Sequence, residues 1–290
     1  MSYIIFCDLT NIGGNMNATN SRYVTPVMAA RVALIQGASR GLGLEFCKHI
    51  LKFKPPAVVI ATCRNPEGAS GLRDLGGEHP GRLTVLGLDV NREEEIRGAA
   101  ERVRQNFGRL DLMVNCSAVL HPSGKGETSL RDVSAQGIIS TFTTNTVGPL
   151  IMAKYFSPLL QKGGGGFGHQ PQEKVKQHKG IIVNITAKVG SIGDNGLGGW
   201  YSYRMSKVAL NMATKNLSIE LGRNQSKVVC VSLHPGTVNT NLSRPYHKNV
   251  PPNKLFSPEH SVNCLMNIID TLHMDKTGRA YSWDGAELPW

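Results

Sequence analysis

A tyrosine and a lysine four residues apart are the side chains of this sequence whose types and spacing point most directly to chemistry. They are Tyr203 and Lys207 in the stretch "YSYRMSK", at the start of a long segment compatible with a helix. Residues i and i+4 share a helix face, so the phenol and the ammonium can enter one pocket. A tyrosine with a pKa of about 10 is a poor acid-base catalyst at neutral pH, and a neighbouring cation favours its ionised form. We therefore predict that Lys207 lowers the pKa of Tyr203; the alternative is an exposed pair without a function.

A glycine-rich stretch, "QGASRGLG" at 36–43, is the second feature that suggests a ligand. It lies between an apolar run and a helix-like segment, where glycines let the backbone turn sharply and approach an anion closely. The free amide groups and the positive end of the following helix would favour a phosphate. The spacing is Gly37-x3-Gly41-x-Gly43, not the G-x-G-x-x-G of the dinucleotide fingerprint. A tight connection is the alternative, but the position in the first strand-helix unit favours a phosphate site.

These groups need a scaffold, and most of the chain repeats one pattern. Short runs rich in β-branched residues are separated by longer segments compatible with helices. The runs lie at 31–36, 57–63, 83–90, 110–116, 180–186 and 227–234. Strands this continuously apolar are buried on both faces, which indicates a parallel sheet between helices. We predict an α/β fold: a single doubly wound Rossmann-type domain over 30–290, a parallel sheet flanked by helices, with its ligand site at the carboxyl ends of the strands.

The glycine turn and the Tyr-Lys pair, taken in order, resemble those of the short-chain dehydrogenase/reductase superfamily. The cofactor turn of that family is written T-G-x3-G-x-G, and this sequence has Gln36 in place of the Thr. The Y-x3-K pair of the family matches Tyr203 and Lys207. The resemblance covers roughly 31–290. The stretch "GSIGDNGLGGWYSYRMSK" and the ending "YSWDGAELPW" are similar to the C-factor-like and sniffer-like carbonyl reductase subgroup.

The resemblance implies roles for further residues. Asn145 in "TTNTVGPL" matches the family Asn that holds the catalytic Lys in a proton relay through a water; a local hydrogen bond within a helix is the alternative. "NCSA" at 115–118 resembles the family's N-N-A-G, and "HPGTVNT" at 234–240 resembles the Pro-Gly motif that holds the nicotinamide carboxamide. The implied cofactor-binding residues, besides Tyr203 and Lys207, are Gly37, Ser39, Arg40, Gly41, Leu42, Gly43, Asp89, Val90, Asn115, Ser117, Pro235, Gly236, Val238 and Thr240.

The sequence departs from the family pattern at the residue that binds the substrate carbonyl. The family has N-I-S-S at the end of its fifth strand, whereas this sequence has "NITAKVGS", with Ala187 at the second Ser. Alternate strand residues face opposite ways, so Thr186 should then point away from the cofactor. Three alternatives stay open for the missing hydroxyl: a bulge that turns Thr186 inward, Ser191 in the following loop, or polarisation by Tyr203 alone.

Basic residues indicate which dinucleotide is bound. Folds of this kind place a carboxylate near the end of the second strand to bind a ribose 2′-hydroxyl, or an Arg to accommodate a 2′-phosphate. Here that strand ends in "ATCRNP", which places Arg64 there, and Arg40 directly precedes Gly41. Two cations without a carboxylate predict NADP(H); two solvent-facing arginines are the alternative.

Together these features predict hydride transfer from NADPH to the carbonyl carbon of an aldehyde, ketone or quinone. Tyr203 would donate the proton, Lys207 would lower its pKa and hold the ribose, and Asn145 would complete the relay. The alternative function is that of a sensor or signalling protein that binds NADP(H) with little turnover. The Ala187 departure favours this alternative, whereas the intact Tyr-Lys-Asn set argues against it.

The net charge of +11 raises the question of a nucleic-acid partner, but the basic residues are spread along the chain. Their one local concentration, at 161–180, has four Lys against one Glu and contains four consecutive glycines. Such a segment cannot bury enough surface to fold alone. We interpret it as a flexible Gly/Lys-rich insertion at the surface, with a polyanion-binding arm as the weaker hypothesis.

Other features of the sequence limit the class of protein. Residues 1–29 are interpreted as a loose N-terminal extension, for which organellar targeting stays open. No apolar run approaches the roughly 18–20 residues that a membrane span needs, so a cytoplasmic protein is expected. The six cysteines are widely spaced without a C-x-x-C pair, which predicts free thiols in a reducing compartment and no metal site. A homodimer and a homotetramer both stay open.

Overall fold

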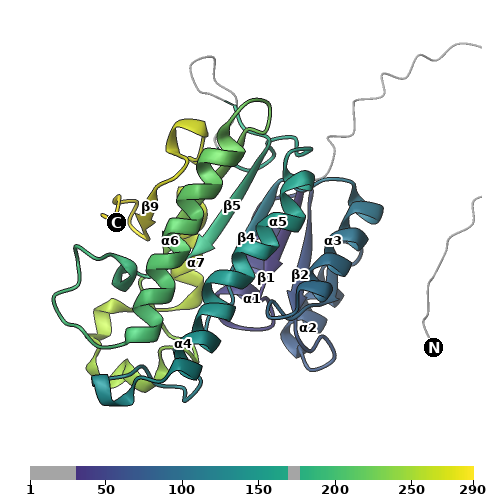
Figure 1. The fold of residues 1–290 in the computed structure, drawn as a ribbon. Helices are drawn as coiled ribbons and strands as arrows, with labels where there is room; N and C mark the ends of the chain where they lie inside the picture. Colours follow the sequence, from purple (N-terminus) through teal and green to yellow (C-terminus); the bar gives the residue numbers. More distant parts are fainter. Residues whose placement is uncertain (1–30, 169–176) are drawn as a thin grey trace, which may run out of the picture.

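The computed structural model describes residues 31–168 and 177–290 (Figure 1). The predicted N-terminal extension lies outside these residues, as does the middle of the predicted insertion at 161–180. The near end of that insertion is packed against the protein, since Phe167 is buried and the Gly164 amide donates to the Asp111 carboxylate at 2.7 Å. A flexible insertion therefore stays a prediction for the residues between 168 and 177.

A seven-stranded parallel sheet forms the centre of the molecule, in the order β3-β2-β1-β4-β5-β6-β9. The strand order runs outward from β1 in both directions, which confirms the predicted doubly wound α/β fold. The strands of the sheet are β1 (Arg31–Gln36), β2 (Ala57–Cys63), β3 (Leu83–Gly87), β4 (Leu112–Asn115), β5 (Gly180–Ile185), β6 (Val228–His234) and β9 (Ala280–Ser282). The α-helices are α1 (Gly41–Phe53), α2 (Ser70–Glu78), α3 (Glu93–Phe107), α4 (Ala135–Phe142), α5 (Gly148–Leu160), α6 (Tyr201–Gly222) and α7 (Pro258–Ile269).

Each face of the sheet packs against its own group of helices, because alternate strand residues point to opposite faces. In β1, Ala33 and Ile35 belong to the core that includes α1 and α7, whereas Val32 and Leu34 belong to the core that includes α3, α5 and α6. Figure 1 shows α5 and α6 crossing in front of the strands. Burial on both faces explains why these strands are apolar along their whole length.

The structure differs from the sequence prediction at the ends and edges of the sheet. The predicted run 83–90 forms a strand only as far as Gly87, because the Asp89 amide donates to the Glu95 carboxylate instead of to a neighbouring strand. The short strand β9 was not predicted, since three residues carry little periodicity. It closes the sheet beside β6, with Ala280 aligned with Ser232. Two further short strands, β7 (Thr237–Val238) and β8 (Leu255–Phe256), pair outside the sheet.

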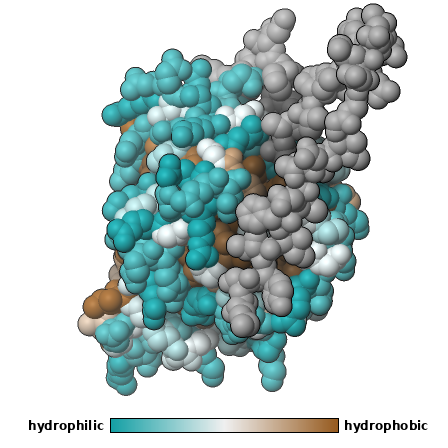
Figure 2. Space-filling model, turned by 90° about the vertical axis from the view of Figure 1, so that its right-hand side faces the viewer, coloured by the Kyte–Doolittle hydropathy of each residue, from teal (hydrophilic) through white to brown (hydrophobic). Residues whose placement is uncertain are grey.

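One face of the described residues is mainly polar. Figure 2 shows one face on which hydrophilic side chains predominate and hydrophobic ones occupy limited areas. No helix in the described part of the chain is long and apolar enough to cross a membrane. Within the same residues, no group of His, Cys, Asp and Glu side chains is placed to hold a metal ion.

Candidate active site

Tyr203 and Lys207 lie one turn apart on α6, beside the carboxyl end of β5. Both side chains are buried, with 7% and 1% of their residue surface exposed. The Lys207 Nζ donates to the carbonyl of Ile185, the last residue of β5, at 2.8 Å. It also lies 5.6 Å from the centre of the Tyr203 ring. The structure therefore places the predicted pair together at the carboxyl edge of the sheet and excludes the alternative of an exposed pair.

Burial changes the proton affinity of both side chains. Loss of hydration lowers the pKa of Lys207 to about 8, and a smaller influence of Cys116 acts in the opposite direction. The same cause raises the pKa of the Tyr203 phenol above its ordinary value. Burial thus shifts the pKa of the phenol in the direction opposite to the predicted effect of Lys207, and a lowering by Lys207 stays a prediction. At neutral pH the phenol is protonated, which is the form that can donate a proton.

Asn145 lies in a π-helical turn, Thr143–Val147, between α4 and α5. Its side chain accepts from the Val119 amide and donates to the Val119 carbonyl, both at 2.8 Å, and also donates to Ser206 Oγ at 3.0 Å. Ser206 Oγ in turn donates to the Tyr203 carbonyl at 2.8 Å. These partners lie on other segments, so Asn145 connects the loop after β4 with α6. Its part in a proton relay stays a prediction. Turns of this kind are frequent at functional sites.

The glycine-rich turn between β1 and α1 leaves no space for a side chain at Gly37 or Gly43. Gly37 has φ +80°, and a Cβ on it would lie 2.5 Å from Ser117 Oγ. A Cβ on Gly43 would lie 2.2 Å from the Gly37 carbonyl oxygen. The glycines therefore allow β1, α1 and the segment after β4 to approach one another closely. The first turn of α1 carries no acidic residue, so its N-terminus suits an anion.

Arg40 and Arg64 lie at the same edge of the sheet. Arg40 directly precedes α1 and Arg64 directly follows β2, the parallel neighbour of β1. Both are exposed, and neither has an ion-pair partner among the described residues. The exposure of both agrees with the alternative of solvent-facing arginines, and their binding of a 2′-phosphate stays a prediction.

The segment after β6 lies beside the glycine turn. A Cβ on Gly41 would lie 3.4 Å from the Thr240 methyl group. Gly236 has φ +76°, and a Cβ on it would lie 2.6 Å from the Phe256 ring, so this turn is closely packed. Val238 is held by the pairing of β7 with β8. The predicted pyrophosphate and carboxamide positions are thus adjacent.

The remaining predicted cofactor residues follow the carboxyl ends of the strands. Asn115 ends β4 and is buried; its Nδ2 donates to Asn184 Oδ1 at 2.8 Å, while its own Oδ1 has no partner among the residues that the structure describes. Asp89 and Val90 lie just after β3. Ser39 and Leu42 belong to the glycine turn and the start of α1, Pro235 follows β6, and Ser117 lies against Gly37.

Each hydroxyl predicted to replace the missing serine has a protein partner. Thr186 is buried directly after β5, and its Oγ1 donates to Asn211 Oδ1 on α6 at 2.7 Å. Ser191 Oγ donates to the Trp290 carbonyl at 3.4 Å. Ala187, at the position of the family serine, has no hydroxyl to offer. A role for Thr186 or Ser191 in binding a substrate carbonyl therefore stays a prediction that would require breaking these bonds.

Two arrangements were missed by the sequence analysis. Gln36 Nε2 donates to Ser117 Oγ at 2.5 Å, and Gln36 Oε1 accepts from the Ser117 amide at 3.1 Å. Gln36 and Ser117 both depart from the family motifs, and these two departures together are the sequence signal that could have predicted their contact.

The other arrangement is Glu127, which is only 3% exposed and accepts from the amide and the hydroxyl of Ser202 at the start of α6. A Glu between Gly and Thr in a polar loop gives no sign of burial.

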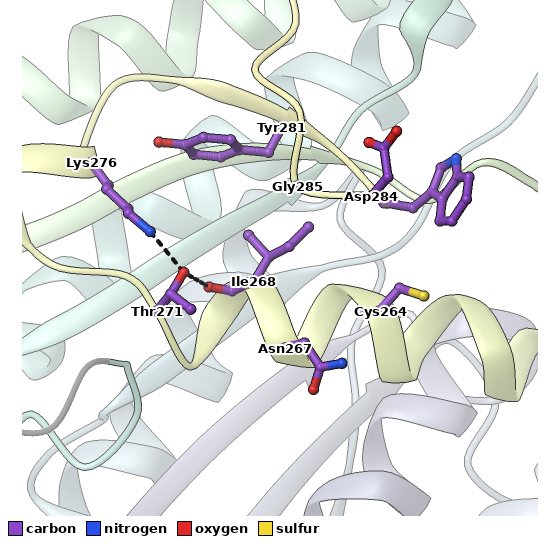
Figure 3. Close-up of a pocket in the computed structure, with 9 residues that line it drawn as sticks. Cys264, Asn267, Ile268, Thr271, Lys276, Tyr281, Asp284 and Gly285 are labelled. Atoms are coloured by element: carbon purple, nitrogen blue, oxygen red, sulfur yellow. Dashed lines mark hydrogen bonds between the residues drawn. The ribbon is translucent and has the colours of Figure 1, made fainter.

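A separate cavity of about 370 Å³ lies between α7 and the segment around β9 (Figure 3). Cys264 and Asn267 line it from α7, and Tyr281 and Asp284 line it from the opposite side. None of the predicted catalytic or cofactor-binding residues lines this cavity. The chemistry suggested by Tyr203 and Lys207 therefore belongs to the carboxyl edge of the sheet and not to this cavity.

A doubly wound sheet with a glycine turn after its first strand and a buried Tyr-x3-Lys pair at its carboxyl edge is the arrangement of a Rossmann-type oxidoreductase. The chain belongs to the short chain dehydrogenase family, whose family model matches residues 31–251.

Individual relatives agree with this assignment. The NADPH-bound carbonyl reductase from chicken fatty liver is 30% identical with a TM-score of 0.78, over 91% of this chain and 100% of the other. The carbonyl reductase Sniffer of D. melanogaster has the same identity and TM-score over 90% of this chain and 100% of its own. The C-signal protein of Myxococcus xanthus is 32% identical over 183 residues, which are 63% of this chain and 94% of the relative. The predicted resemblance to this family is thus confirmed.

Proposed function

We propose that this protein reduces a carbonyl compound with NADPH as the hydride donor. The observation that carries the proposal is the buried Tyr203 and Lys207 pair at the carboxyl edge of the sheet, 5.6 Å apart from Nζ to ring centre. Support comes from the chicken enzyme, which is an NADPH-bound carbonyl reductase, and from Sniffer, which is also a carbonyl reductase. Both are similar to this chain over almost its whole length.

The residues present fit NADP(H). The N-terminus of α1 follows the glycine turn and carries no acidic residue in its first turn, which suits a pyrophosphate, and the unpaired Arg40 and Arg64 suit a 2′-phosphate. The unpartnered Asn115 Oδ1 lies at the same edge. Gly236 and Thr240 would hold the carboxamide end. NADPH, when bound, supplies the hydride.

The protein supplies the proton and the charge that stabilises its transfer. Tyr203 donates its phenolic proton to the carbonyl oxygen of the substrate, since burial keeps the phenol protonated at neutral pH. Lys207, held by the Ile185 carbonyl, stabilises the phenolate that remains. Asn145, which contacts Val119 and Ser206, fixes α6 relative to the loop after β4 and completes the relay that returns a proton to Tyr203.

The test is NADPH consumption with a panel of aldehydes, ketones and quinones. Tyr203→Phe should lower kcat by about 10²–10⁴-fold, the range typical of a lost general acid. Tyr155→Phe is the matched control, because this tyrosine on α5 donates to Glu93 at the surface and should leave kcat unchanged within a factor of two. Equal turnover by the Tyr203→Phe protein and the wild type would refute the proposed mechanism.

A second function is favoured by one observation. Ala187 replaces the serine of the family, and both neighbouring hydroxyls, of Thr186 and Ser191, already donate to protein groups. A protein that binds NADP(H) as a sensor does not need that hydroxyl. Tight binding of NADPH without turnover of any compound in the panel would support the sensor over the reductase.

A further inference from the structure

The residue before α6 has a strained backbone. Trp200 has φ 49° and ψ 44°, in the left-handed region, and follows Gly198 and Gly199, which have φ 65° and 64°. Glycine adopts this conformation without strain, whereas a tryptophan does not. Strained residues of this kind persist only where the surroundings hold them, and they cluster at functional sites. Trp200 lies three residues before Tyr203.

The loop after β4 holds Trp200 in this conformation. The Trp200 amide donates to the Glu127 carbonyl at 2.6 Å, and the Glu127 carboxylate accepts from the Ser202 amide at 3.2 Å and from the Ser202 hydroxyl. The indole ring lies directly over Gly126, where a Cβ would be 2.6 Å from the ring. The buried Glu127 therefore fixes the first turn of α6, and Gly126 provides the space for the indole.

The indole of Trp200 faces the catalytic tyrosine on one side and Tyr246 on another. Its centre lies 6.1 Å from the Tyr203 ring in an edge contact and 4.7 Å from the Tyr246 ring. Tyr246 belongs to the 3₁₀ turn Arg244–Asn249, which follows β6 and the short β7, and its hydroxyl accepts from the Gly126 amide at 2.8 Å. Because the Tyr246 hydroxyl already accepts this hydrogen bond, the ring is the part of the side chain that can contact a ligand. The loops after β4, β5 and β6 thus meet at two aromatic rings.

We propose that Trp200 and Tyr246 form an aromatic wall of the substrate pocket, and that they select carbonyl compounds whose carbonyl is attached to a planar aromatic ring. The proposal rests on the proposed function in that it assigns the acceptor of the same site. Both rings are half-buried beside the almost fully buried Tyr203, so they retain surface for a ligand. Aromatic rings prefer stacked or edge-to-face contacts with other aromatic rings, a preference that a saturated ring cannot satisfy.

The kinetic test compares two aldehydes of nearly equal size, benzaldehyde and cyclohexanecarbaldehyde. The wild type should favour benzaldehyde in kcat/KM by about three- to tenfold, the factor expected of one aromatic pair. Trp200→Leu and Tyr246→Leu should each bring this ratio close to one, mainly through KM. Met212→Leu, on an exposed part of α6, is the control and should keep the wild-type ratio.

Binding gives a readout that does not depend on turnover. With NADP⁺ bound, acetophenone and cyclohexyl methyl ketone cannot be reduced, so calorimetry measures their dissociation constants alone. Acetophenone should bind about three- to tenfold more tightly to the wild type and equally to Trp200→Asn. Asn tolerates the left-handed conformation, so this variant keeps the backbone without the ring.

Equal affinity of the two ketones for the wild type, no binding of either, or an unchanged preference in Trp200→Asn would each overturn the proposal. A binding preference without turnover would instead refute the reductase function and leave the aromatic wall in place.

Discussion

Lys207 must carry a positive charge to stabilise the Tyr203 phenolate, but its burial disfavours that charge. Its pKa is about 8, below the ordinary value of 10.5, because the ammonium has lost its hydration. We expect kcat/KM for carbonyl reduction to fall as the pH rises through about 8, since the neutral amine cannot stabilise the Tyr203 phenolate. Initial rates between pH 6 and 10 with saturating NADPH would measure this. A rate that stays constant up to pH 10 would contradict the assignment.

The pH dependence of stability provides an independent check of the Lys207 pKa, because the free energy of unfolding should rise over the pH range in which kcat/KM falls. Between pH 8 and 10.5 the unfolded chain binds more protons at Lys207 than the folded chain, so the free energy of unfolding should rise with pH in this window. Below pH 8 the buried charge lowers stability by a constant amount. Lys207→Met should therefore unfold at a higher urea concentration than the wild type at pH 7, and this difference should shrink towards pH 10.5.

At the scale of elements, Gly37, directly after β1, and Gly43 in α1 form a contact that a single methyl group would break. Gly43→Ala places a Cβ 2.2 Å from the Gly37 carbonyl oxygen, so we expect a loss of stability and of NADPH affinity. Gly98→Ala is the matched control, because Gly98 lies inside α3 with nothing within 4 Å of its Cβ position. It should stabilise the protein by roughly 0.5–1 kcal/mol, the usual gain of Ala over Gly in a helix. Thermal melts of both variants would show whether the two effects have opposite signs.

Elements with a strong periodicity could be predicted from the sequence, and those defined by distant contacts could not. The runs at 31–36 and 57–63 form strands with the predicted bounds, because continuous apolar residues are sufficient to mark a buried parallel strand. The Tyr203 and Lys207 pair was predictable because its spacing matches one helical turn. By contrast, the burial of Glu127 depends on Ser202, 75 positions further along the chain, and no local pattern carries that information. The family motif could not reveal either that burial raises the pKa of the Tyr203 phenol, because burial depends on the packing of the whole site.

At the scale of the whole molecule, binding of a cofactor should stabilise the fold by mass action. A ligand that binds only the folded state at a hundred times its Kd adds about 2.7 kcal/mol. NADPH should therefore raise the melting temperature more than NADH at the same concentration, because Arg40 and Arg64 are unpaired at the carboxyl edge. Arg64→Asp should reduce or reverse the difference, with Arg102→Asp, on the surface of α3, as a control. Equal shifts by the two cofactors would argue against a 2′-phosphate site.

The late position of β9 in the chain also affects how the protein is made. This strand occupies Ala280–Ser282 and covers the side of β6 that would otherwise form the edge of the sheet. During synthesis, β1 to β6 leave the ribosome before β9, so the side of β6 that faces away from β5 stays without its partner strand until Ala280–Ser282 emerge. In that interval the nascent chain exposes an apolar strand edge to other nascent chains. Slow translation of the residues between β6 and β9 should therefore increase aggregation without changing the stability of the folded protein.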